Sequence, residues 1–187
     1  LQMEGAVDEV ETAIQSAGFD ALPTSAFRAA GPETFRNIPL YVEVSGSNRR
    51  NADVPLEVSW RIDGTTWSPF QPIGTLRITH PSLLIQGKHR LEMRAREVGR
   101  YSTLDRTPDA VEIIVDTVPP VLTVEDNEQS AKIEVSDLVS RPEDIVLEYK
   151  FNDGQWQELS DNRLEWPPQT DVRIRATDEA GLITEHA

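Results

Sequence analysis

The histidines of this 187-residue chain do not show the spacing of a metal or catalytic site. His80, His89 and His186 are scattered, and no His-x-x-x-His pair is present. The sequence also lacks a G-x-S-x-G nucleophile motif, a phosphate-binding glycine loop and a dinucleotide-binding fingerprint. A pair of carboxylates of the kind that glycosidases use is left as an alternative. We expect a protein that is not an enzyme.

Aromatic residues offer a first candidate binding surface. Trp67 is followed by Phe70 and by an enlarged segment, residues 68–88. An exposed Trp67 could stack on a sugar ring, so Trp67 and Phe70 are candidate ligand-binding residues. Alternatively Trp67 is a packing residue, because Trp156 occupies the matching position in the second half of the chain.

Basic residues form a second candidate surface. They lie on or beside one predicted strand, at Lys88, Arg90, Arg94, Arg96 and Arg100, and we expect Arg61 on a neighbouring strand. Arginines on the outer face of a sheet could receive an acidic partner, including a carboxylate-rich polysaccharide. We therefore predict a partner-binding face made of Arg61, Arg90, Arg94 and Arg96 with the two aromatic residues. Alternatively, these arginines pair across strands with Glu57 and Glu92.

Carboxylates in the second half could hold calcium. Oxygen ligands of the right kind occur at Asp116, Asp126, Glu128, Asp178 and Glu179. The Asp-x-Asn-Asp-Asn pattern of cadherin-like arrays is absent from the sequence. We expect no cofactor, with calcium at these residues as the alternative.

The charge distribution bounds the class of partner. The net charge is −14, and residues 119–187 carry six basic and 16 acidic side chains. Such a segment repels phosphate backbones, so we expect no nucleic-acid partner. The simplest interpretation of the acidity is solubility. No apolar run is long enough to cross a bilayer, so we expect no direct membrane insertion.

The N-terminal segment has a helical pattern. Apolar residues recur at spacings of four, three, four and three, at Met3, Val7, Val10, Ile14 and Ala17. Gly18 follows where a helix C-cap belongs, so residues 1–21 are predicted to form a helix. It could pack on the first β domain, end an upstream domain, or act as a docking helix. Residues 22–37, interrupted by prolines and a glycine, are predicted to be a connector.

From residue 38 the apolar period becomes two, which predicts strands. The same pattern of strands and turns occurs twice, in residues 40–97 and 131–179. In both copies a tryptophan follows the last apolar strand residue by five positions, from Ile62 to Trp67 and from Phe151 to Trp156. We predict two domains, residues 38–118 and 119–187, joined by a semi-rigid Pro-Pro hinge within Val115–Val121.

Three stretches carry a family resemblance: Leu147–Trp156, Val172–Gly181 and Asp116–Val121. They resemble the immunoglobulin-like and fibronectin-type-III-like repeats of bacterial surface, secreted and periplasmic proteins. The resemblance covers roughly residues 38–187 and implies an all-β fold of two tandem immunoglobulin-like antiparallel sandwiches, here with a short N-terminal helix. The absence of cysteine excludes the disulfide-bonded antibody type. The first copy departs from the pattern at Arg96–Gly99.

The resemblance implies a non-catalytic role. We expect an architectural and interaction segment of a larger bacterial protein, extracellular, at the cell surface or periplasmic. Because the chain begins at Leu1, we expect it to be a mature or excised part. Its partners would be another protein or other domains of the same polypeptide, with a glycan as the alternative. Two other functions are an adhesin-like carbohydrate- or peptide-binding module and a periplasmic sensor segment that dimerises through the N-terminal helix.

Overall fold

The computed structural model describes residues 9–19, 39–49 and 52–187, and its regular elements there are β-strands and short 3-10 helices. The chain divides into two compact units, unit 1 (Leu1–Ile113) and unit 2 (Ile114–Ala187). The prediction of an all-β fold is therefore confirmed. Within the described ranges, no helix is long and apolar enough to span a bilayer.

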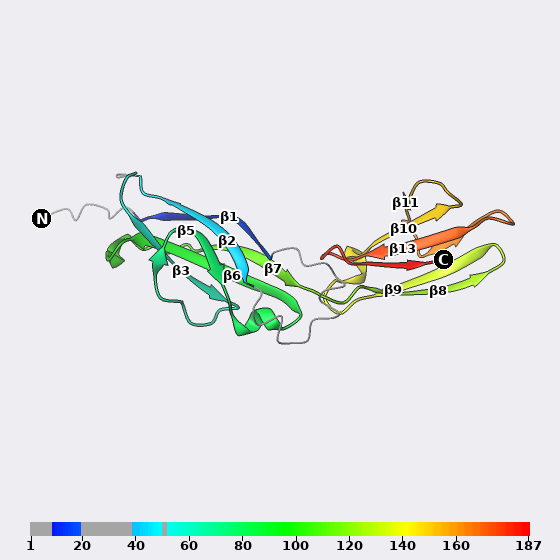
Figure 1. The fold of residues 1–187 in the computed structure, drawn as a ribbon, viewed down its shortest axis with the longest axis horizontal. Helices are drawn as coiled ribbons and strands as arrows, with labels where there is room; N and C mark the ends of the chain where they lie inside the picture. Colours follow the sequence, from blue (N-terminus) through cyan, green and yellow to red (C-terminus); the bar gives the residue numbers. More distant parts are fainter. Residues whose placement is uncertain (1–8, 20–38, 50–51) are drawn as a thin grey trace, which may run out of the picture. The chain divides into compact units, whose positions relative to one another are not determined.

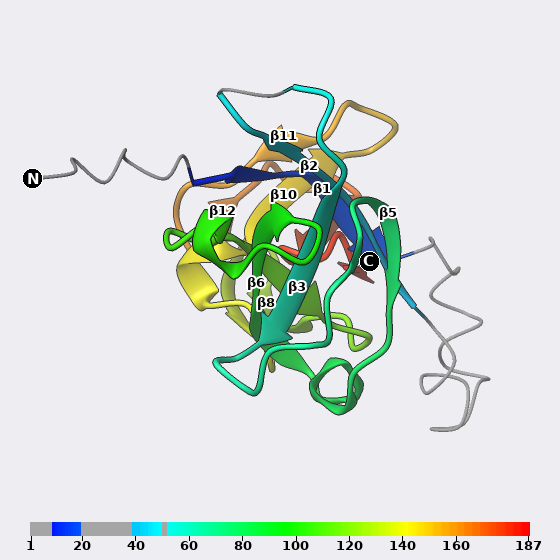
Figure 2. The same cartoon turned by 90° about the vertical axis from the view of Figure 1, so that its left-hand side faces the viewer.

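Unit 1 contains two antiparallel sheets (Figures 1 and 2). Both contribute fully buried apolar side chains, such as Val42 of the first sheet and Met93 of the second. The first sheet has the order β1 (Glu11–Phe19), β2 (Leu40–Ser47), β5 (Gly74–Ile78). The second has the order β4 (Gln71–Pro72), β3 (Leu56–Ile62), β6 (Gly87–Glu97), β7 (Asp109–Val115). Short 3-10 helices η1 (Pro81–Leu84) and η2 (Tyr101–Thr103) flank β6. Alternate residues of β2 and β6 are buried, as the period of two predicts.

Unit 2 repeats this two-sheet arrangement with a smaller core. One sheet has the order β12 (Arg163–Glu165), β9 (Ser130–Ser136), β8 (Val121–Asn127). The other has the order β11 (Gln157–Glu158), β10 (Val146–Phe151), β13 (Val172–Thr177), β14 (Ile183–His186), and η3 (Pro142–Asp144) precedes β10. One core cluster joins the sheets: Ala131, Ile133, Ile145, Leu147, Leu164, Ile174 and Ala176.

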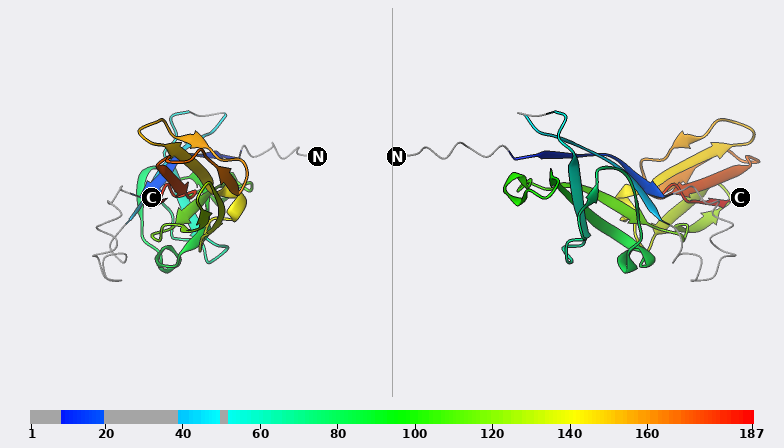
Figure 3. Two further views of the ribbon diagram at one scale, coloured as in Figure 1. Left: turned by 90° about the vertical axis from the view of Figure 1, so that its right-hand side faces the viewer. Right: turned by 60° about the vertical axis from the view of Figure 1, so that its left-hand side comes forward.

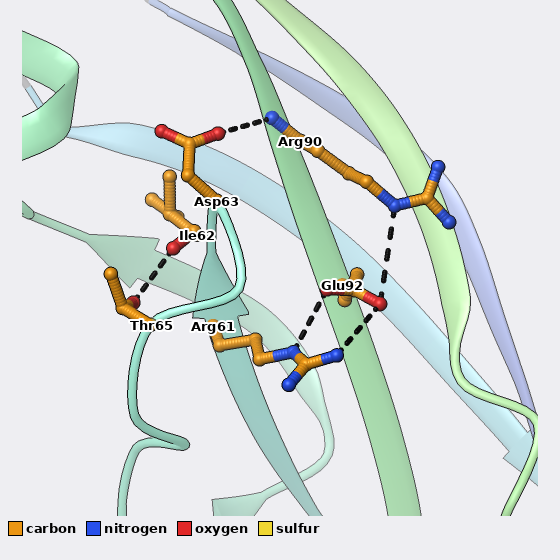
Figure 4. A network of polar contacts seen from close by, with 6 residues as sticks. All are labelled: Arg61, Ile62, Asp63, Thr65, Arg90 and Glu92. Atoms are coloured by element: carbon orange, nitrogen blue, oxygen red, sulfur yellow. Dashed lines mark hydrogen bonds and ion pairs between the residues drawn. The ribbon is translucent and has the colours of Figure 1, made fainter.

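The turn after β3 shows how an Asp-Gly pair fixes local geometry. Asp63 and Gly64 both have positive φ, 50° and 69°, which is the conformation that this pair favours in tight turns. The Asp63 carboxylate accepts a hydrogen bond from the Arg90 backbone N–H at 2.8 Å, and the Thr65 hydroxyl donates to the carbonyl of Ile62 at 2.7 Å (Figure 4). The turn is thereby tied to the start of β6.

The predicted N-terminal helix is wrong over residues 11–19, which form strand β1 along β2 (Figure 3, right). The reason is a β-bulge. The register shifts between Ile14 and Ser16, so Ile14 lies opposite Val44 and Ala17 opposite Val42. One extra residue turns a strand period of two into a spacing of three, which imitates a helix in the sequence. Residues 1–8 and 20–21 of that prediction, and the predicted connector 22–37, lie outside the described residues.

Strand β1 is held by groups from the far part of unit 1. The Thr12 N–H donates to Asp105 Oδ2 at 2.9 Å, and the Ile14 N–H donates to Asp109 Oδ2 at 2.8 Å. The Ala95 N–H of β6 donates to the Thr12 hydroxyl at 2.8 Å. Asp105 is only 3% exposed. These side chains satisfy backbone donors that lie outside the sheet ladder.

We expect Asp105→Ala to destabilise unit 1 by about 2 kcal/mol, because the part-buried hydrogen bonds that Thr12 and Thr107 donate to this buried carboxylate are lost. Chemical denaturation would measure the free energy of unfolding, and hydrogen exchange of residues 9–19 should rise. The matched control is Asp161→Ala, at an exposed position of unit 2, which should change neither. Unchanged protection of β1 in Asp105→Ala would show that this carboxylate does not hold the strand.

Candidate functional site

The predicted arginine-aromatic face is assembled on β3, β6 and the segment between β3 and β4. The guanidinium carbon of Arg94 lies 3.9 Å from the ring centroid of Trp67, and that of Arg61 lies 4.6 Å from it. The guanidinium of Arg96 lies 3.7 Å from the ring centroid of Phe70. These are cation–π distances. We call these five residues the arginine-aromatic face.

Arg90 does not join this face. Its side chain is 67% exposed, and its Nε lies 3.9 Å from a carboxylate oxygen of Glu92 (Figure 4). At this exposure the ion pair is largely screened by solvent. Arg90 instead contributes its backbone N–H to the turn at Asp63. The structure therefore separates one of the four predicted arginines from the rest.

Cross-strand ion pairs occupy two of the arginines. Arg61 makes two hydrogen bonds to the carboxylate of Glu92, at 2.8 and 3.1 Å (Figure 4), and Arg96 Nε donates to Glu57 at 2.7 Å. Hydrogen bonding from Arg61 lowers the pKa of Glu92. The pKa of Glu57 is lowered first by the Gly99 backbone N–H and also by Arg96. The alternative of pairing with Glu57 and Glu92 is confirmed for these two arginines.

The ring of Trp67 is already in contact with side chains of its own unit. Trp67 is half-buried, and two guanidinium groups lie over its ring. The corresponding tryptophan of unit 2 is arranged in the same way, with Arg175 at 4.3 Å and Lys150 at 5.0 Å from the centroid of Trp156. A tryptophan ring in contact with two basic side chains is therefore common to both units, which favours the packing alternative for Trp67.

The histidines hold local structure. His80 packs edge-on against Trp60, with ring centroids 6.0 Å apart. His89 is buried, and its ring nitrogens lie 2.7 Å from an Asp63 carboxylate oxygen and 2.8 Å from the Ile85 carbonyl oxygen. These contacts fasten the turn and the 3-10 segment to β6.

An aspartate cluster in unit 2 is the second candidate site. Asp116 is the first residue after β7, Asp137 the first after β9, and Asp178 the first after β13. One carboxylate oxygen from each lies within 4.8 Å of the others. The residues that directly follow three strands thus bring one carboxylate each to the cluster.

The two oxygens of each aspartate have different roles. One oxygen holds a turn: Asp116 Oδ1 accepts from the Val118 N–H at 3.0 Å, and Asp178 Oδ1 accepts from the Leu182 N–H at 2.8 Å. Asp137 Oδ2 likewise accepts from two backbone N–H groups, at 2.8 and 2.7 Å. The other oxygen of each is buried without a hydrogen-bond partner in the described part of the chain. Asp178 as a whole is only 6% exposed.

Burial and like charge act together on these carboxyl groups. Burial raises the pKa of Asp116, and the neighbouring charges of Asp137 and Asp178 raise it further. Burial also raises the pKa of Asp178, again with a contribution from Asp137. The turn N–H groups oppose these effects only in part. The cluster therefore concentrates negative charge that calls for a cation.

The arrangement fits a calcium ion. Two oxygens that ligate one Ca²⁺ at about 2.4 Å can be separated by at most about 4.8 Å, so the cluster meets this condition. The donor set is made of carboxylates alone, which suits a hard cation rather than zinc or copper. Asp116, Asp137 and Asp178 would supply three of the six to eight ligands that Ca²⁺ takes, with other oxygens completing the shell.

The sequence located part of this cluster. Asp116 and Asp178 were predicted calcium ligands and are brought together here. Asp126 is exposed near the end of β8 and Glu128 lies in the turn after it, so both are outside the cluster. Glu179 follows Asp178 but is not a member either. Asp137 was not predicted, although it directly follows β9 as Asp116 directly follows β7, so its position at a strand end was the available signal.

Comparison with known proteins adds no further constraint. No family model matches this chain, and no curated protein is significantly similar to it.

The raised pKa values of Asp116 and Asp178 give a pH dependence. A carboxyl whose pKa is raised by folding holds its proton more tightly in the folded protein, so it destabilises the fold at neutral pH and ceases to do so as pH falls. Without divalent cations, we expect wild-type protein to gain stability relative to the Asp116→Asn/Asp178→Asn variant as pH is lowered from 7 towards about 4. Thermal melts of both proteins in chelator would measure it.

The variant is also the control, because the carboxylates of unit 1 whose pKa values are lowered are the same in both proteins. Parallel curves for the two proteins would contradict the electrostatic strain inferred for the cluster.

Proposed function

We propose that this chain is a non-catalytic architectural segment of a larger bacterial surface, secreted or periplasmic protein, in which calcium stabilises unit 2. The observation that carries the proposal is the set of three buried, unpartnered carboxylate oxygens of Asp116, Asp137 and Asp178. The two-sheet architecture of each unit and the sequence resemblance to immunoglobulin-like repeats support a pair of rigid β modules as the scaffold.

Calcium would act by relieving electrostatic repulsion within the aspartate cluster. Three carboxylates that lie together and are partly shielded from water repel one another. A bound divalent cation would attract all three carboxylates and so link three positions of unit 2, the residues that directly follow β7, β9 and β13. The Glu179 backbone N–H already donates to the buried Ser140 hydroxyl at 3.1 Å, so the loops after β9 and β13 touch each other beside the site. A bound ion would add a second contact between these two loops.

The alternatives have less support. A carbohydrate-binding module needs an accessible aromatic face, and the ring of Trp67 is half-buried and already in contact with two guanidinium groups. The sensor alternative requires dimerisation through an N-terminal helix that contains Val10 and Ile14. Ile14 belongs to strand β1, and Val10, immediately before β1, is fully buried, so neither residue supports such a helical interface. A peptide-binding role for the arginine-aromatic face is compatible with the proposal.

Calcium titration of the full chain tests the proposal. At a calcium concentration about 100 times the dissociation constant, binding stabilises the folded state by about 2.7 kcal/mol. For a unit of this size that raises the melting temperature of unit 2 by about 10 °C or more. Hydrogen exchange should become slower in the loops after β9 and β13.

Two variants with the same change of charge make the test specific. Asp137→Asn should abolish the response to calcium, whereas Asp126→Asn, at an exposed position outside the cluster, should keep it. An equal response in the two variants, or no response in wild-type protein, would overturn the proposal. A response to magnesium but not calcium would correct the identity of the ion.

A further inference from the structure

Arg94 differs from the other arginines of the arginine-aromatic face. Arg61 and Arg96 each have a carboxylate partner, Glu92 and Glu57. Arg94 stacks on Trp67, and within the described ranges its Nε is buried without a hydrogen-bond partner. The side chain as a whole is partly exposed. It is therefore a guanidinium that the fold positions but does not neutralise.

Unit 2 shows what the missing partner would be. Arg175 lies over Trp156 as Arg94 lies over Trp67, and its Nε donates to Glu148 at 2.6 Å. Glu148 is directly opposite Arg175 across the β10–β13 pair. A carboxylate at this position completes the arrangement.

Unit 1 has a serine at that position. Ser59 is directly opposite Arg94 across the β3–β6 pair. The Ser59 side chain is fully buried, and its hydroxyl donates to the Ser68 carbonyl at 2.7 Å, so it is committed to the backbone. Unit 1 thus keeps the arginine and the tryptophan of the arrangement and lacks the glutamate.

The surroundings of Arg94 favour an incoming anion. Its pKa is lowered chiefly by burial; Tyr101 offsets this in part, and the neighbouring charges of Arg61 and Arg96 lower the pKa further. The charged form is therefore poorly compensated, and a carboxylate brought to it gains more than at a solvated surface arginine. The stacking on Trp67 also pre-orients the planar guanidinium, so less side-chain entropy is lost on binding.

We propose that Arg94 anchors an interaction surface on unit 1 that receives a carboxylate side chain from an acidic segment of a protein partner. A glutamate fills the matching position of unit 2, which favours a side-chain carboxylate. A sugar acid is disfavoured, because guanidinium groups already contact the half-buried rings of Trp67 and Phe70 on which its pyranose would stack. The surface lies within unit 1 and does not depend on calcium binding in unit 2.

The test uses the full chain in chelator at low ionic strength, with a hexaglutamate peptide as the probe. Nitrogen-15 NMR would follow the arginine Nε–H and tryptophan indole signals during titration. We expect saturable shifts of the Arg94 and Trp67 signals. Arg94→Gln should weaken binding at least tenfold, and Arg94→Lys, which keeps the charge but loses the planar fork, should weaken it less. Circular dichroism would verify that both variants keep their strand content.

Arg175→Gln is the matched control, since it removes an arginine that stacks on a tryptophan and already has a partner. It should leave hexaglutamate binding unchanged. The proposal is overturned if wild-type protein shows no saturable shift at millimolar peptide, or if Arg94→Gln binds as wild type does. A parallel titration with polygalacturonate covers the other source of carboxylates: Arg94-dependent binding of that polymer alone would overturn a protein partner.

Discussion

The burial of one apolar face of each sheet against its partner sheet is the interaction on which the rest of this structure depends. Ile133 and Ile174, from the two sheets of unit 2, are almost completely buried, and each such side chain contributes about 1.5–3 kcal/mol. Because the inner faces are committed to this core, charged groups are left with the outer faces and the strand ends. The arginine-aromatic face occupies the first location and the aspartate cluster the second.

The aspartate cluster shows how a small fold can tolerate repulsive charge. Each carboxylate divides its two oxygens between a turn and the cluster, so the residue that ends a strand also sets the position of its free oxygen. The turns after β7, β9 and β13 and the cluster are therefore one structure. A change that loosens one of these turns also moves a carboxylate of the cluster.

Much of the fold follows from apolar periodicity. The period of two from residue 38 predicted strands, and β3, β6, β10 and β13 lie within the two repeated segments, residues 40–97 and 131–179. The bulge at Gln15 was not visible, because it shifts the phase of a strand by one residue and leaves a spacing that a helix also produces. Long-range pairing with β2, rather than local propensity, decides the conformation of β1.

The sites were predictable only in part, for a similar reason. Ligands such as Asp116 and Asp178 can be proposed from residue type, but which carboxylates converge depends on where strands end in space. Asp137, like Asp116, is an aspartate directly after a strand, but it was not predicted as a ligand. Arg94 lacks a carboxylate partner because Ser59 lies opposite it across the sheet. That pairing depends on strand register and cannot be read from the charged residues alone.

The hydrogen bonds that seat β1 also bear on how the chain is made. Thr12 is bound by Asp105 and Ile14 by Asp109, partners that are 93 and 95 positions later in the chain. A ribosome releases the first strand of unit 1 early and its last anchors late. Assembly of unit 1 is therefore delayed until nearly all of its residues have been synthesised, and its topology is that of a slow folder. Strand β1 can pair with β2 early, but the hydrogen bonds that Asp105 and Asp109 make to it can form only late in the synthesis of unit 1.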